Sequence, residues 1–105
     1  MKTLVMGESD SLPVVLRHLL KLRHGQIIFK GVWNGTVGEQ SDLKAVIHVH
    51  DKKLIELLFR NGVLGATEGF ISGYWTSENL VEVVQILARN RDVLDRMNQN
   101  IIYFI

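Results

Sequence analysis

Two histidines have a spacing that could bind a metal ion. His48 and His50 lie two positions apart in a segment that alternates apolar and polar residues, which predicts a strand with both imidazoles on one face. Asp51 and Glu39 are the nearby acidic residues that could supply further ligands. Two ligands do not make a metal centre. We therefore predict a polar sheet face and no bound metal.

One carboxylate, Glu68, stands in an apolar segment and could act as a general acid or base. No phosphate-binding glycine loop and no nucleophile elbow accompanies it in the sequence. The glycines at 65, 69 and 73 also lack the spacing of the dinucleotide-binding fingerprint. We therefore expect Glu68 to hydrogen-bond the backbone, and we predict no catalytic residue and no cofactor in this chain.

The segment around Glu68, residues 65–75, combines three glycines with three aromatic residues. Repeated glycine indicates backbone with positive φ or a very close approach of another surface. Aromatic side chains beside glycine indicate a large apolar contact. We expect Gly65, Glu68, Gly69 and Gly73 to shape a bend between two helices, and we expect that bend to carry an apolar surface. The alternative is that the aromatic residues belong to the core.

A second candidate surface is basic. Apolar residues on one face predict an amphipathic helix over residues 10–22, with Pro13 in its first turn and Gly25 ending it. Arg17, Lys21 and His24 cluster on the opposite face. This cluster is either a solvated helix face or a contact for an anionic lipid surface or an acidic partner.

The remaining pattern predicts the elements that position these residues. Residues 26–39 resemble a β-hairpin with Asn34-Gly35 in a type I′ turn, and residues 43–50 alternate as a half-buried strand. Asp51 begins a helix over residues 52–61, Tyr74-Trp75 form a short fourth strand, and Ser77 caps a third helix with the stripe Leu80, Val83, Val84 and Leu87. A last helical stretch covers residues 92–98. The predicted fold class is α+β, a small antiparallel meander of three to four strands packed with three to four helices.

Composition narrows the function further. The chain has 105 residues, a formal net charge of +1 and no cysteine, so nothing global indicates nucleic acid, and disulfides are excluded. No segment has the length of a signal peptide core or a membrane span, so a cytoplasmic protein is expected. The chain ends on the apolar residues 100–105, either a docking tail or the point where a further domain begins. We expect residues 1–105 to form one domain, the first of a longer protein.

These motifs resemble a known family. Val49-His50-Asp51, Gly62-Val63-Leu64-Gly65-x-x-Glu68-x-Phe70-Ile71-x-Gly73-Tyr74-Trp75, Leu80-Val81 and Leu87-Ala88-Arg89-Asn90 are similar to the N-terminal domain of cyclopropane-fatty-acyl-phospholipid synthases. The similarity covers about residues 25–90. Ala66-Thr67, Phe70, Ser72 and Tyr74 depart from the family pattern while keeping its apolar character. The order of elements also resembles, more loosely, the sterol-carrier-protein fold.

The resemblance implies an accessory, lipid-binding role. In that family a methyltransferase domain follows, which uses S-adenosylmethionine to add a methylene to an unsaturated acyl chain of a membrane phospholipid. This chain would bind the phospholipid membrane, at the inner membrane face, and present acyl chains to that domain. Each buried methylene contributes about 0.8 kcal/mol to such binding. Arg17, Lys21 and His24 would contact anionic headgroups, and the lipid-binding candidates are Phe59, Val63, Leu64, Phe70, Ile71, Tyr74 and Trp75. The alternatives are a brace or homodimer interface for the methyltransferase domain and a free-standing lipid or sterol carrier.

Overall fold

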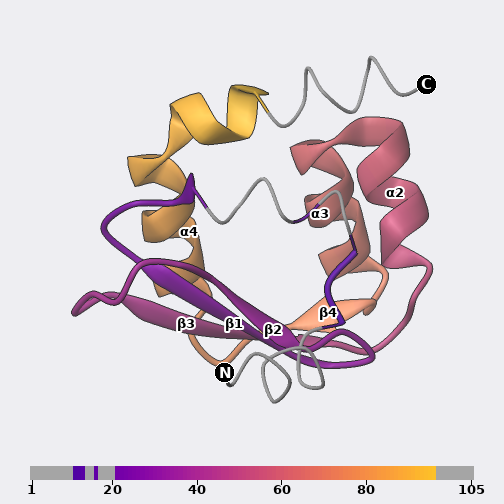
Figure 1. Ribbon diagram of the computed structural model, residues 1–105. Coiled ribbons are helices and arrows are strands. Elements are labelled where there is room, and N and C mark those ends of the chain that lie inside the picture. The colour runs from indigo at the N-terminus through magenta and orange to yellow at the C-terminus, as the bar shows by residue number, and fades with distance from the viewer. Residues whose placement is uncertain (1–10, 14–15, 17–20, 97–105) are drawn as a thin grey trace.

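The computed structural model describes residues 11–13, 16 and 21–96 (Figure 1). Its strands are β1 (Gln26–Gly31), β2 (Gly35–Gly38), β3 (Lys44–Val49) and β4 (Trp75–Thr76), and its helices are α2 (Leu54–Asn61), α3 (Val63–Ile71) and α4 (Leu80–Arg89). Residues 91–96 are also helical, as expected for the last helical stretch. Most of the helix predicted over residues 10–22 and the apolar run 100–105 lie outside the described residues.

The four strands form one mixed sheet in the order β2-β1-β3-β4. β1 is antiparallel to β2 but parallel to β3, and β3 is antiparallel to β4. The α+β class is therefore confirmed, and the prediction of a purely antiparallel meander is wrong. Gln26, the first residue of β1, pairs with Gly38 of β2 on one side and with Lys44 of β3 on the other. The connection from β2 to β3, residues 39–43, therefore passes around the start of β1. The return strand β2 thus replaces the long crossover that parallel neighbours usually need.

The predicted type I′ turn at Asn34-Gly35 is also wrong, because neither residue has positive φ. β1 continues to Gly31, which pairs with Val49 of β3. The side-chain Nδ2 of Asn34 donates to the Gly31 carbonyl across the loop at 2.9 Å. The hairpin therefore opens, and Trp33 leaves the strand and enters the core.

One face of the sheet is buried beneath the helices. Ala45, Ile47 and Val49 are buried on β3, which confirms the predicted alternation. Ile27 and Phe29 of β1 share this buried face. Figure 1 shows α4 over one end of the sheet and the α2–α3 pair over the other.

α4 is fixed to the edge of β3 by side chains rather than by a helix cap. The Ser77 hydroxyl donates to the Val46 carbonyl at 2.6 Å, and the Val46 N–H donates to the Asn79 side chain at 3.2 Å. These two bonds continue the ladder beyond β4. The Ser77 hydroxyl also accepts from the Asn79 N–H at 3.0 Å, but the N-cap residue of α4 is Asn79, so the predicted N-cap at Ser77 lies two residues too early.

The buried face of α4 also differs from the predicted stripe. Val83 and Ile86 are buried, whereas Leu80 and Val84 are exposed. Ile86 packs against Gly25, where an added Cβ would lie 2.6 Å from its Cγ1. The absent side chain at residue 25 therefore leaves room for Ile86 on the buried face of α4.

Asn90, after the end of α4, is fully buried, and its side chain makes three hydrogen bonds. Its Oδ1 accepts from the Arg23 N–H at 2.8 Å, and its Nδ2 donates to the carbonyls of Arg23 and Ile86 at 2.9 and 2.8 Å. A single amide thereby fastens the segment before β1 to the end of α4.

An exposed ion pair lies beside this junction. Slight burial raises the pKa of Asp92, but the Val93 N–H and the guanidinium groups of Arg23 and Arg96 outweigh it, so the pKa of Asp92 is below its ordinary value. Any stabilisation from this pair is present above the unfolded-state pKa and is lost as the pH falls through the folded-state pKa. Solvent screening keeps it small.

We expect Asn90→Ala to lower the free energy of unfolding by about 2–4 kcal/mol, because it leaves buried backbone groups of Arg23 and Ile86 without partners. Gln85→Ala, which removes a side-chain amide at an exposed position of α4, is the matched control and should cost less than about 0.5 kcal/mol. Urea unfolding of both variants measures this. Equal losses would mean that the Asn90 bonds do not hold the junction.

Candidate functional site

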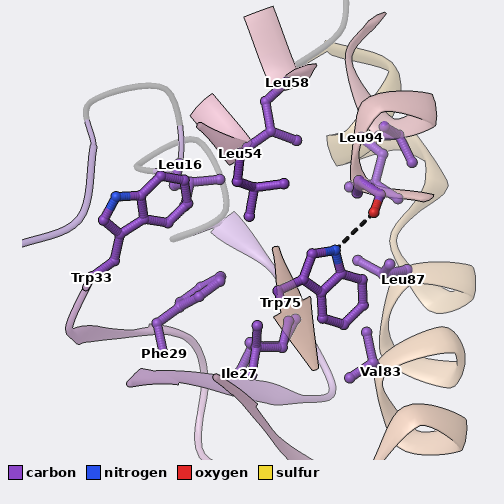
Figure 2. Close-up of a pocket in the computed structure, with 13 residues that line it drawn as sticks. Leu16, Ile27, Phe29, Trp33, Leu54, Leu58, Trp75, Val83, Leu87 and Leu94 are labelled. Atoms are coloured by element: carbon purple, nitrogen blue, oxygen red, sulfur yellow. Dashed lines mark hydrogen bonds between the residues drawn. The ribbon is translucent and has the colours of Figure 1, made fainter. Parts of the chain in front are cut away.

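A cavity of about 80 Å³ lies between the α2–α3 pair, α4 and the buried face of the sheet (Figure 2). Every residue that lines it is apolar or aromatic. The lining residues are Leu16, Ile27, Phe29, Trp33, Ile47, Leu54, Leu58, Val63, Ala66, Trp75, Val83, Leu87 and Leu94.

The polar atoms nearest to the cavity are not available to a ligand. The Trp75 indole N–H donates to the Ala66 carbonyl at 2.7 Å. Figure 2 shows the Trp33 nitrogen on the side of its ring that is turned away from Trp75. Within the described residues, no buried side-chain nitrogen or oxygen lacks a hydrogen-bond partner. The cavity therefore suits an apolar ligand and offers no group for acid–base catalysis.

The glycines around Glu68 do not form the predicted bend between helices, because residues 63–71 are the helix α3. An added Cβ at Gly65 would collide with the Leu57 carbonyl of α2, and one at Gly69 would collide with the Leu54 side chain. Of the glycines at 65, 69 and 73, only Gly73 has positive φ, at 80°, in the turn before β4. Close packing against α2 thus outweighs the poor helix propensity of glycine at positions 65 and 69.

The predicted lipid-binding residues separate into two groups. Val63 and Trp75 line the cavity. Phe70 does not line it: its side chain is 37% exposed and its ring lies against Trp75 with centroids 5.1 Å apart. Tyr74 is half-buried at the edge of the core.

The second group faces solvent instead of the cavity. Leu64 is 64% exposed and Ile71 is 79% exposed, both on the outer side of α3, and Phe59 of α2 is 39% exposed. α3 thus has an inner face of glycine and alanine and an outer face with large apolar side chains.

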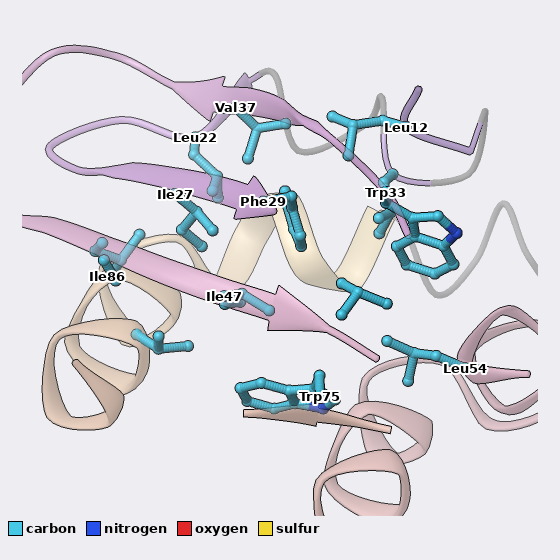
Figure 3. Packing of buried hydrophobic residues seen from close by; sticks show 14 of the residues in the cluster. Leu12, Leu22, Ile27, Phe29, Trp33, Val37, Ile47, Leu54, Trp75 and Ile86 are labelled. Carbon is cyan, nitrogen blue, oxygen red and sulfur yellow. The ribbon is translucent and has the colours of Figure 1, made fainter. Parts of the chain in front are cut away.

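Most of the cavity wall was not among the predicted site residues. The strand residues Ile27, Phe29 and Ile47 belong to the buried cluster shown in Figure 3, where they point to the same side of the sheet as Trp33 and Trp75. The alternation of residues 43–50 predicted that Ile47 lies on the buried face of its strand. It gave no indication of a cavity, since a gap above a sheet depends on how the helices are spaced.

Glu68 bonds to a side chain and not to the glycine backbone. Its Oε1 accepts from the Asn61 amide at 2.7 Å, so it links α3 to the last residue of α2. This contact lies on an exposed surface, apart from the cavity-lining residues.

Of the predicted headgroup contacts, Lys21 and His24 are exposed, and Arg17 lies outside the described residues. His24 has φ of 59°, and its N–H donates to the Glu39 carboxylate at 2.9 Å. The bond places the Glu39 carboxylate beside His24, within the surface predicted to be basic.

His48 and His50 share the outer face of β3, with ring centroids 6.5 Å apart and nearly parallel planes. His50 Nε2 is 2.7 Å from the Thr76 hydroxyl. Among the described residues, no group of three or more potential ligand side chains is placed to hold a metal ion.

Comparison with protein-family models finds no matching family, and neither curated proteins nor solved structures give a match. None of the described helices has the length and apolar character needed to cross a membrane.

We expect Gly65→Ala to destabilise the protein by about 1–3 kcal/mol, because the new methyl group would collide with the backbone of α2. Without that collision, the same substitution would stabilise α3 by up to about 1 kcal/mol, because alanine has a higher helix propensity than glycine. The sign of the change in unfolding free energy therefore shows whether the two helices are in close contact. Thr67→Ala on the exposed side of α3 is the control and should stay within about 0.5 kcal/mol. Thermal unfolding measures both. A stabilised Gly65→Ala variant would contradict the close approach of the two helices.

Proposed function

We propose that this chain is a non-catalytic lipid-binding domain that docks on a phospholipid membrane and receives an acyl chain. By its sequence resemblance, it would serve the methyltransferase domain of a cyclopropane-fatty-acyl-phospholipid synthase, which binds S-adenosylmethionine. The looser likeness to sterol-carrier proteins is part of the same proposal. The observation that carries it is the wholly apolar cavity, whose wall includes residues of α3 and β4 from the glycine–aromatic segment.

A second observation supports membrane docking. Leu64 and Ile71 lie seven positions apart on α3, so they occupy one side of the helix, and both are largely exposed. Burying a leucine or isoleucine side chain in an apolar phase is favourable by about 1.5–3 kcal/mol. Two such side chains at one surface would contribute about 3–6 kcal/mol to reversible attachment to a bilayer, at the inner membrane face in this proposal.

The brace or homodimer is the second candidate, and one observation favours it. α3 contains no lysine or arginine, so its outer face carries no charge that would attract an anionic headgroup. The same two exposed side chains would then pack against the methyltransferase domain or a second copy of this chain.

We expect the protein to co-sediment with liposomes, more strongly when they contain anionic lipid, and we expect salt to weaken the anionic component. Leu64→Ser with Ile71→Ser should reduce binding to either liposome by about tenfold or more, from the lost apolar contact. The matched control is Val81→Ser with Val84→Ser, which removes two exposed apolar side chains from α4.

The control variant should bind like the wild-type protein. Equal losses in both double variants would contradict docking through α3. Absence of binding at every lipid composition would reject the membrane role and leave the brace.

A further inference from the structure

We propose that the cavity binds the methyl end of an unbranched alkyl chain, inserted tail first, with the polar end of the ligand remaining outside. This inference rests on the proposed lipid-binding function and specifies which part of a lipid the domain recognises. It also separates an acyl ligand from a sterol.

The chemistry of the wall determines the orientation. A carboxylate, phosphate or hydroxyl inside the cavity would lose its water and find no partner, because the lining side chains are apolar and the Trp75 N–H is already bonded to Ala66. A terminal methyl group loses nothing on entering. The ligand must therefore present its hydrocarbon end.

The size of the cavity determines the shape of that end. On the measure that gives about 80 Å³ here, one water molecule needs roughly 10–15 Å³. The space accepts a short stretch of alkyl chain but not a rigid fused-ring system. The rest of a long acyl chain would stay outside, where an enzyme could reach it.

Two tryptophans make this testable, because Trp33 and Trp75 are the only tryptophans of the chain and both line the cavity (Figure 2). Bromine quenches indole fluorescence on contact. We compare two fatty acids of equal chain length, one brominated at the terminal methyl carbon and one brominated next to the carboxylate. The expected result is quenching by the terminal bromide only, although both acids compete equally for the site.

The single-tryptophan variant Trp33→Phe should retain part of this quenching, since Trp75 remains in the wall. Ala66→Leu fills the cavity and should weaken binding of the terminal bromide by about tenfold, the loss expected for two displaced methylene groups. Ala88→Leu, at an exposed position of α4, is the matched control and should bind normally.

Equal quenching by both bromides, quenching by neither, or displacement of the terminal bromide by cholesterol would overturn the inference. These outcomes are independent of liposome binding. A protein that sediments with liposomes but shows no position-dependent quenching keeps the proposed function and loses the tail-first site. A protein that shows the quenching but never binds a liposome loses the membrane role.

Discussion

The arrangement of this domain depends on Trp75, which joins the sheet to the α2–α3 pair. Its backbone pairs with Val49 of β3, and its indole N–H bonds to the Ala66 carbonyl of α3. The ring also lies against Gly69, where an added Cβ would come within 3.4 Å of it. One side chain thus links α3 to the sheet at a fixed distance, and the absent side chain at Gly69 leaves room for Leu54 of α2.

The cavity follows from how the two helical units are fastened. The carbonyl of Tyr74 accepts from the N–H groups of His50 and Asp51, which ties the turn after α3 to the end of β3. α4 is held separately, by Ser77 and Asn79 at the other part of β3 and by Asn90 at its own end. Because each unit is attached at its own position along the sheet, the spacing between them is fixed by these bonds. The apolar side chains of the wall then line the space between the units without filling it.

The two faces of α3 differ in what they contact. Its glycine and alanine face packs on α2 and the tryptophan, and its opposite face exposes Leu64 and Ile71. In the proposed role, these faces correspond to the two things a lipid-handling domain must do. The outer face would contact the bilayer, and the inner face would help to enclose the chain end. In that role, a helix that contributes both to the exposed apolar surface and to the cavity wall would link docking to ligand entry.

The sequence by itself determined the local features. Alternation predicted the buried face of β3, Gly62 marked the end of α2, and the glycine–aromatic order indicated close backbone approach, which the collisions at Gly65 and Gly69 bear out. These features follow from the alternation of side chains along a strand and from the absent side chain of glycine. Both are properties of a residue and its neighbours in the sequence. The tertiary structure decided the rest. The parallel pairing of β1 with β3 depends on contacts between strands, which no local pattern specifies.

The same holds for the helices. Residues 63–71 form a helix because packing against α2 outweighs the poor helix propensity of glycine. On α4, Ile86 packs into the space left by the absent side chain of Gly25. The cavity is the extreme case. Its wall combines residues from three strands, a loop and several helical segments, and its volume depends on the separation between elements that the sequence places far apart.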